Sequence, residues 1–304
     1  MSVSVLLENV AGFTGEGPHW DETTNRLYHV DIGGSTVHRW DAGTQQNSSV
    51  NVGGYTGFVI PSTKGDLIIG LENKIARLNW DTKEVIELAE VQHGQNTRFN
   101  DAKCDASGRL WAGTMSRESY PSQPEDIKFE KGAFYSYSVD GVIKQQLDKI
   151  TCSNGMAWTK DNSVMYYIDS IPRKVYAFDF DINKGTLANR KVAIDYGDES
   201  TLSSLGYPDG MCMDTEGKLW VACYGASKVI RFDPETGKPL REIKFPDSRR
   251  ITSCCFGGAN FDELFVTSAK SVDPAEDVKF PLAGSVFRVT GLGVKGCPAS
   301  KFDG

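Results

Sequence analysis

Four side chains with oxygen atoms recur at one position of a repeated sequence pattern. Glu16, Asn100, Asn154 and Asp209 each lie nine or ten residues before a short apolar run. Carboxylate and amide oxygens are the ligands that hard divalent cations such as Ca²⁺, Mg²⁺ and Mn²⁺ prefer. If the repeats surround a common axis, these side chains point into one channel from the same level. The sequence therefore predicts a ring of metal ligands.

Each of these residues taken alone is also compatible with a turn. Asn154-Gly155 and Asp209-Gly210 are common turn dipeptides, and Glu16-Gly17-Pro18 is compatible with a simple loop. Independent turns have no reason to share one repeat position, however. For the set as a whole we therefore favour the metal site over the turns.

The elements that would position these residues are short β-strands. Six apolar or aromatic runs start 40 to 55 residues apart, and each follows a turn rich in Asp, Gly or Asn. A second run, enriched in β-branched or aromatic residues, comes after each of them. Such residues fit a half-buried pleated surface, and the runs are too short for helices. The six first runs are residues 26–31, 66–71, 109–114, 164–169, 218–223 and 263–268.

Six units with about four short strands each predict an all-β fold, a six-bladed β-propeller with four antiparallel strands per blade. We expect one such domain over residues 1–304. The sixth unit lacks a fourth strand, and the N-terminal run 2–7 is free to supply it and close the ring, which would cover an open sheet edge. A two-sheet sandwich is the alternative, but it does not explain the sixfold spacing.

Two long connections should overhang the predicted metal. Residues 115–131 and 269–283 are longer than the corresponding segments of the other units, and the first is polar and contains proline, as expected of a lid. Arg98, two residues before Asn100, should lie at the same mouth, where its guanidinium would hold a substrate oxygen. The alternatives are tolerated surface insertions and a solvated arginine.

Composition limits the cellular locations and the kinds of partner that we expect for this protein. The chain has 33 Lys plus Arg against 40 Asp plus Glu, and a net charge of −7 argues against a nucleic-acid partner. No run approaches 18 apolar residues, so we expect no membrane span. The N-terminus shows no secretion signal, and seven cysteines without a CxxC pair suit reduced thiols. We expect a cytoplasmic protein.

The sequence resembles the regucalcin, gluconolactonase and luciferin-regenerating enzyme family nearly from end to end. The resemblance implies a six-bladed propeller with one divalent cation in its channel. It rests on these stretches: Arg98-Phe-Asn-Asp101, Ala112-Gly-Thr-Met115, Ser153-Asn-Gly155, Tyr166-Tyr-Ile-Asp-Ser170, Pro208-Asp-Gly-Met-Cys212, Glu216-Gly-Lys-Leu-Trp-Val-Ala-Cys-Tyr224, Thr252-Ser-Cys-Cys-Phe-Gly-Gly258 and Thr290-Gly-Leu-Gly-Val-Lys-Gly296.

The resemblance also implies roles for individual residues. The cation ligands of the family match Glu16, Asn154 and Asp209, and its substrate contacts match Arg98, Asn100 and Glu118. Two departures bear on substrate preference rather than on the metal. Ala102 stands where the family has glycine, and a longer, Ser-rich segment, residues 197–207, precedes Asp209.

The function implied is that of a metal-dependent lactonase acting on sugar lactones such as gluconolactone. The cation, one of Ca²⁺, Zn²⁺, Mn²⁺ or Mg²⁺, would polarise the lactone carbonyl, and Asp209 would also serve as general base on the attacking water. Two alternatives remain open: a calcium-binding regulatory protein, and an enzyme of the luciferin-regenerating type.

Overall fold

The computed structural model describes residues 1–118 and 124–304, and these residues form 24 β-strands with only short helices. Four sheets each contain four strands that are consecutive in the chain and pair antiparallel in chain order. Their strands are β2 (Gly15–Asp21), β3 (Arg26–Asp31), β4 (Thr36–Asp41), β5 (Gln46–Asn51); β6 (Thr56–Pro61), β7 (Leu67–Leu71), β8 (Lys74–Leu78), β9 (Val85–Glu90); β10 (Thr97–Cys104), β11 (Leu110–Ser116), β12 (Gly132–Tyr137), β13 (Ile143–Ile150); and β14 (Ser153–Trp158), β15 (Val164–Asp169), β16 (Lys174–Asp181), β17 (Thr186–Asp195).

The remaining strands form one eight-stranded sheet that consists of two sets of four. The sets, β18–β21 and β22–β24 with β1, are joined by a single residue pair, Tyr224 with Arg250. β1 pairs antiparallel with β24, which confirms that the N-terminal run completes the last set. The strands are β1 (Ser2–Leu7), β18 (Tyr207–Met213), β19 (Leu219–Tyr224), β20 (Lys228–Asp233), β21 (Lys238–Lys244), β22 (Arg250–Gly257), β23 (Glu263–Ala269) and β24 (Val286–Thr290).

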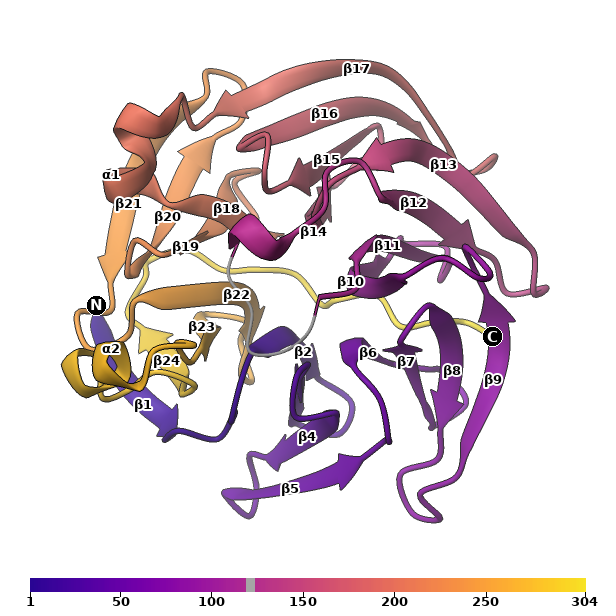
Figure 1. The fold of residues 1–304 in the computed structure, drawn as a ribbon, viewed down its shortest axis with the longest axis horizontal. Coiled ribbons are helices and arrows are strands. Elements are labelled where there is room, and N and C mark those ends of the chain that lie inside the picture. The colour runs from indigo at the N-terminus through magenta and orange to yellow at the C-terminus, as the bar shows by residue number, and fades with distance from the viewer. Residues whose placement is uncertain (119–123) are drawn as a thin grey trace.

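The sets are arranged around a centre (Figure 1), with β2, β6, β10, β14, β18 and β22 innermost and strands such as β5, β9 and β13 at the periphery. Each innermost strand contacts the next, and β22 contacts β2, so the circle is closed. The innermost strands are buried, whereas β5 and β21 are mostly exposed. This all-β architecture of radial antiparallel sheets is consistent with a propeller, and the six predicted first runs coincide within two residues with β3, β7, β11, β15, β19 and β23.

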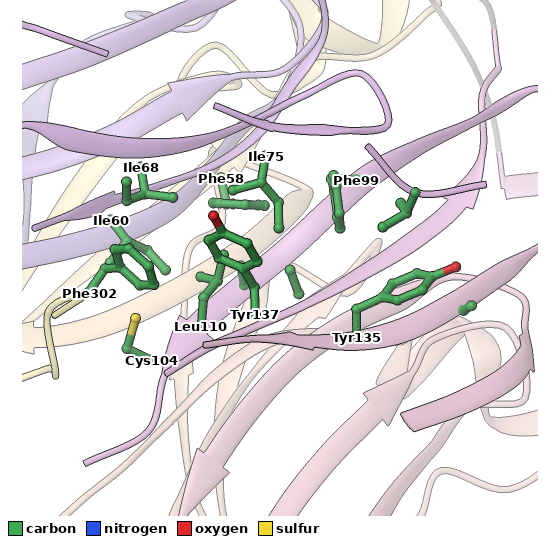
Figure 2. Packing of buried hydrophobic residues seen from close by; sticks show 14 residues of the cluster. Phe58, Ile60, Ile68, Ile75, Phe99, Cys104, Leu110, Tyr135, Tyr137 and Phe302 are labelled. Atoms are coloured by element: carbon green, nitrogen blue, oxygen red, sulfur yellow. The ribbon is translucent and has the colours of Figure 1, made fainter. Parts of the chain in front are cut away.

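The hydrophobic core lies between neighbouring sheets. Figure 2 shows one cluster in which residues of the β6–β9 sheet face residues of the β10–β13 sheet. Phe58 and Phe99 meet edge to face there, with ring centroids 5.7 Å apart. Aromatic side chains bury large areas, so each such contact locks the angle between two sheets. That angle in turn positions the innermost strands.

The C-terminal segment crosses from the last set to the β6–β9 sheet (Figure 1). It pairs on the way with Asp214, Cys104 and Ser62, through Gly296, Ser300 and Phe302. Phe302 joins the cluster of Figure 2 and stacks on Tyr137, with centroids 5.7 Å apart. The last residues therefore contact three strand sets, those that begin with β6, β10 and β18.

Short helical turns occur only in long connections of the described chain, and the sequence predicted none of them. They are η1 (Pro124–Asp126), η2 (Glu199–Thr201), α1 (Leu202–Leu205) and α2 (Pro274–Lys279). Asp273 caps the start of α2, since its carboxylate accepts from the Ala275 N–H, and Pro274 occupies the first helical position. Helices this short leave no 3.6-residue apolar period to detect. None of the helices in the described residues has the length and apolar content to span a membrane.

Candidate active site

Four residues predicted from the repeat meet at the centre of the molecule. Glu16, Asn100, Asn154 and Asp209 lie on β2, β10, β14 and β18, and each is at most 7% exposed. All four line one cavity of about 230 Å³. Asn100 Nδ2 donates to Asn154 Oδ1 at 3.1 Å, which links neighbouring strand sets directly. The repeat position therefore corresponds to a real spatial cluster.

A β-bulge explains why these residues share one repeat position. In β10, β14 and β18 the pairing register with the following strand shifts at Asn100, Asn154 and Asp209, and in β2 it shifts just after Glu16. A bulge takes residues out of the regular ladder and re-aims their side chains. The bulges thus turn the polar side chains into the cavity.

Gly155 and Gly210 follow two of these residues because neighbouring strands approach closely. A Cβ at Gly155 would lie 2.6 Å from Met211 N, and one at Gly210 would overlap the Ser253 hydroxyl. Both glycines lie inside strands, β14 and β18. The turn interpretation of Asn154-Gly155 and Asp209-Gly210 is therefore wrong: glycine is needed here for space.

The two carboxyl groups of the cluster act on each other. Glu16 and Asp209 lie within hydrogen-bonding reach. Burial, with the nearby Asp101 carboxylate, raises the pKa of Glu16 to about 8. Burial and the charge of Glu16 raise the pKa of Asp209 well above its usual value. Two buried acids held this close favour a shared proton or a cation between them.

The third oxygen of the cluster is held in a fixed orientation. Asn154 Nδ2 donates to Ser170 Oγ at 2.8 Å, which turns Oδ1 toward Asn100. A carbonyl oxygen has two lone pairs, so Oδ1 retains one for a cation. Among the described residues, no three His, Cys, Asp or Glu side chains gather as a metal site. A cation here would thus need the Asn154 amide beside the two carboxylates.

Asp101 is a buried acid of this centre that the sequence reasoning passed over. It is 2% exposed, its Oδ1 accepts from the Ala102 N–H, and its Oδ2 has no hydrogen-bond partner among the described residues. It lines a second cavity, with His19 and Lys103, and its charge raises the pKa of both Glu16 and Asp209. The one sequence feature that could have indicated Asp101 is its position next to Asn100, and the structure places both residues in the same bulge.

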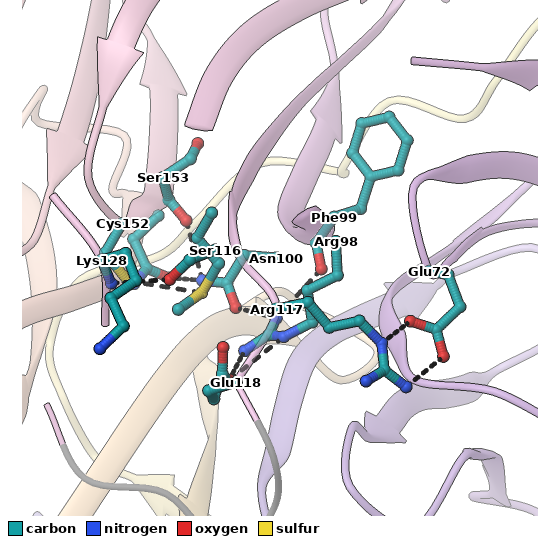
Figure 3. Close-up of polar contacts among 12 residues, drawn as sticks. Glu72, Arg98, Phe99, Asn100, Ser116, Arg117, Glu118, Lys128, Cys152 and Ser153 are labelled. Carbon is teal, nitrogen blue, oxygen red and sulfur yellow. Dashed lines mark hydrogen bonds and ion pairs between the residues drawn. The ribbon is translucent and has the colours of Figure 1, made fainter. Parts of the chain in front are cut away.

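Arg98 and Glu118 form a buried ion pair beside Asn100 (Figure 3). Arg98 Nε and Nη2 donate to Glu118 Oε1 at 3.2 and 2.5 Å, and Nη1 donates to Asn100 Oδ1 at 2.7 Å. The side chains of the pair are only 3% and 4% exposed. Glu118 Oε2 is buried without a hydrogen-bond partner in the described part of the chain. The three predicted substrate-contact residues therefore form one network, and the solvated-arginine alternative for Arg98 is wrong.

Both connections predicted to overhang the site contribute to the cavity. Glu118 and Ile127 come from the first, and Lys270, Ser271 and Val272 from the second. Residues 119–123 lie outside the described residues. At the two ends of the first connection, Arg117 pairs with Glu72 and the Lys128 N–H donates to Ser116 Oγ at 2.8 Å (Figure 3). These contacts hold the two ends of the connection between β11 and β12 against β11 and Glu72.

Known proteins resemble this chain along nearly its whole length. A model of the SMP-30/Gluconolactonase/LRE-like region matches residues 14–270. A regucalcin from Danio rerio is 42% identical over 291 residues, which cover 95% of each chain.

Solved structures extend the comparison to the fold. A luciferin-regenerating enzyme is 32% identical, with a TM-score of 0.89 over 99% of this chain and 100% of its own. A gluconolactonase from Xanthomonas campestris has a TM-score of 0.72 over 94% of this chain and 88% of its own. Its identity of 22% makes it similar in fold alone.

Proposed function

This chain belongs to the SMP-30/gluconolactonase/LRE-like family, and we propose that it is a divalent-metal-dependent lactonase that hydrolyses sugar lactones. The observation that carries the proposal is the buried cluster of Glu16, Asn154 and Asp209 in a cavity shared with the Arg98–Glu118 pair. The family model, whose description includes gluconolactonase, and relatives named regucalcin support this class of activity.

The proposed cation ligands are Glu16, Asn154 and Asp209. Their donor set, two carboxylates and one amide oxygen, fits Ca²⁺, Mg²⁺, Mn²⁺ or Zn²⁺. The raised pKa values of both acids support the fit, because a cation would compensate the charge that burial and mutual repulsion disfavour. When bound, a divalent cation polarises a carbonyl and stabilises the negative charge that develops on its oxygen.

Arg98, Asn100 and Glu118 are the proposed substrate-binding residues. The guanidinium of Arg98 is held by Glu118, Asn100 and the Phe99 carbonyl, so its charge faces the cavity in a fixed orientation. Glu118 Oε2 is a buried acceptor suited to a substrate hydroxyl. Orientation by such preformed contacts matters because a misplacement of about 1 Å can cost on the order of 10²-fold in rate.

Asp209 is also the proposed general base. Its carboxylate would accept a proton from a water whose oxygen forms the new bond to the lactone carbonyl carbon. The ring C–O bond then breaks, and the proton passes to the departing alkoxide oxygen. The product is the open-chain hydroxy acid, and no further reactant is needed beyond water.

We also propose that the chain forms one six-bladed propeller over residues 1–304. The closed circle of innermost strands supports six blades if the two joined sets of the eight-stranded sheet are counted separately. A cytoplasmic location is part of the same proposal and is supported by seven free cysteines, six of them buried.

Substitution of the ligands tests the proposal. We expect Asp209→Ala and Asn154→Ala each to lower gluconolactone kcat/KM by at least about 10²-fold, the scale of losing one transition-state contact. Asp148→Ala, an exposed acid on β13, is the control and should retain full activity. Full turnover by both site variants would overturn this assignment of the site.

A further inference from the structure

Part of the cavity is lined by apolar and aromatic side chains. It lies on strand sets other than the one that carries Arg98 and Asn100, and we call it the apolar wall. Its residues stand at strand ends or in the loops that adjoin them, at the same mouth of the ring as the metal cluster. They are Phe13, Ile32, Ile171, Tyr207, Tyr224 and Val272.

Two serine side chains near the apolar wall are engaged by the protein. Ser170 Oγ accepts from Asn154 Nδ2, and Ser271 Oγ donates to Glu276 Oε2 at 2.6 Å. The Arg250 guanidinium lies 5.9 Å from the centroid of the Tyr224 ring. Thr14 and Lys270 are the other polar side chains of this part of the lining.

A sugar lactone that carries hydroxyls on several ring carbons needs hydrogen-bond partners on several sides. Glu118 Oε2 and the second lone pair of Asn100 Oδ1 offer acceptors on one side of this cavity. A hydroxyl turned toward the apolar wall would exchange water for carbon neighbours, which is unfavourable. An alkyl or aromatic group in the same place would move from water to apolar surroundings. This transfer raises the affinity about fourfold for each fully buried methylene.

We propose that this site prefers lactones whose ring carries an apolar substituent, an alkyl chain or an aryl group, seated against the apolar wall. The lactone ring then lies between the metal cluster and the Arg98–Glu118 pair. This inference rests on the proposed lactonase function and adds to it the class of substrate. Ile171 lies in the connection between β15 and β16, directly after Ser170, the hydrogen-bond partner of Asn154, and is the residue of the wall chosen for the test.

A comparison of three lactones tests the inference on the metal-loaded full chain. δ-Valerolactone is the bare ring, δ-decalactone adds a pentyl chain, and gluconolactone adds hydroxyls instead. We expect kcat/KM for δ-decalactone to exceed that for δ-valerolactone at least about tenfold, a conservative fraction of the gain for a buried five-carbon chain.

Two variants separate the wall from general effects of substitution. Ile171→Asn should lower the δ-decalactone to δ-valerolactone ratio at least about fivefold, since it places an amide where the chain would lie. Ile86→Asn, which alters a half-exposed isoleucine of the outer strand β9, is the matched control and should leave the ratio as it is.

The outcomes distinguish this inference from the function on which it rests. If gluconolactone is hydrolysed and the δ-decalactone to δ-valerolactone ratio is one or lower, the apolar-substituent inference is overturned and the lactonase proposal stands. An unchanged ratio in Ile171→Asn also overturns the role of the wall. If the metal-loaded protein hydrolyses none of the three lactones, both proposals are overturned.

Discussion

At the scale of single residues, the centre of the molecule concentrates buried charge. Glu16, Asp101 and Asp209 are buried acids that act on one another, and Arg98 and Glu118 form a buried pair beside them. Buried charges are stabilised only by partners or by a bound ion. A cluster of them at the centre of a fold therefore indicates a binding or catalytic site. The ion pair offers the most direct test of this view.

Removal of the Arg98 side chain should lower the free energy of unfolding far more than removal of a neighbouring arginine side chain. Arg98→Ala leaves Glu118 buried and unpaired, and we expect the free energy of unfolding in urea to fall by about 3–5 kcal/mol. The control is Arg117→Ala, whose pair with Glu72 is 37% and 29% exposed and should contribute about 1 kcal/mol or less. Similar losses in both variants would mean that the buried pair has no special role.

The sequence allowed part of this centre to be predicted. Glu16, Asn100, Asn154 and Asp209 were accessible because a repeat aligns them at one bulge position. Asp101 was not, because its influence is electrostatic and depends on burial that appears only when the strand sets close around it. Glu118 was predicted from the family resemblance alone, since a connection without regular structure has no repeat spacing from which a site residue can be predicted.

At the scale of the elements, bulges in the innermost strands orient the polar side chains of the site. They require small residues where the next strand passes, and Gly155 is the clearest case because its neighbours are backbone atoms of Met211 and Asp209. The strands themselves were predictable, since short apolar or aromatic runs after turns specify them, and the run at residues 164–169 agrees with β15 in both bounds. The short helices were not, because local capping and not periodicity forms them.

A methyl group at Gly155 should disturb stability and the site together. Gly155→Ala would press a Cβ against Met211 N and Asp209 O, and overpacking of this kind costs about 1–3 kcal/mol. We expect that loss in urea unfolding and a weaker affinity for divalent cations by calorimetry, because Asp209 shares the strained contact. Gly43→Ala, in an exposed turn, is the control; wild-type cation affinity in Gly155→Ala would contradict the coupling.

A stacked histidine pair between β3 and β4 predicts acid sensitivity. The rings of His29 and His38 are 4.6 Å apart and parallel, and neither His29 nitrogen has a hydrogen-bond partner among the described residues. Burial, reinforced by His38, holds the pKa of His29 well below its usual value. Below about pH 6.5 the unfolded chain therefore binds protons that the folded chain does not, and stability falls as the pH falls.

Urea unfolding at pH 7.5 and pH 5 checks the sign of this effect. His29→Phe should reduce the loss of stability between the two pH values by about 2 kcal/mol, the linkage expected for one histidine kept neutral. His93→Phe, whose side chain is 90% exposed, should leave the loss unchanged. An equal loss in wild type and in His29→Phe would refute the assignment.

At the scale of the whole molecule, both chain ends close the structure. β1 completes the last strand set, and the C-terminal segment crosses to the β6–β9 sheet and inserts Phe302 into its core (Figures 1 and 2). The first closure was predictable, because a sixth unit lacked a strand. The second was not, since residues 291–304 show neither strand periodicity nor a repeat, and only the packed structure reveals their contacts.

The C-terminal anchor should therefore contribute strongly to stability. Phe302 is 2% exposed, so Phe302→Ala should lower the free energy of unfolding by about 3–5 kcal/mol, the usual cost of emptying a buried aromatic site. Phe129, which is 71% exposed, offers a control of the same chemistry, and Phe129→Ala should change stability little. A loss below about 1 kcal/mol in Phe302→Ala would show that the segment is not an anchor.

The central claim, a metal-dependent lactonase centred on Glu16, Asn154 and Asp209, is tested most directly by gluconolactone hydrolysis with metal-stripped protein. Ca²⁺, Mg²⁺, Mn²⁺ and Zn²⁺ are then returned separately. We predict that stripping abolishes turnover and that at least one ion restores it. Full turnover without metal would contradict the account, and so would tight metal binding without hydrolysis, which would instead favour a calcium-binding regulatory protein.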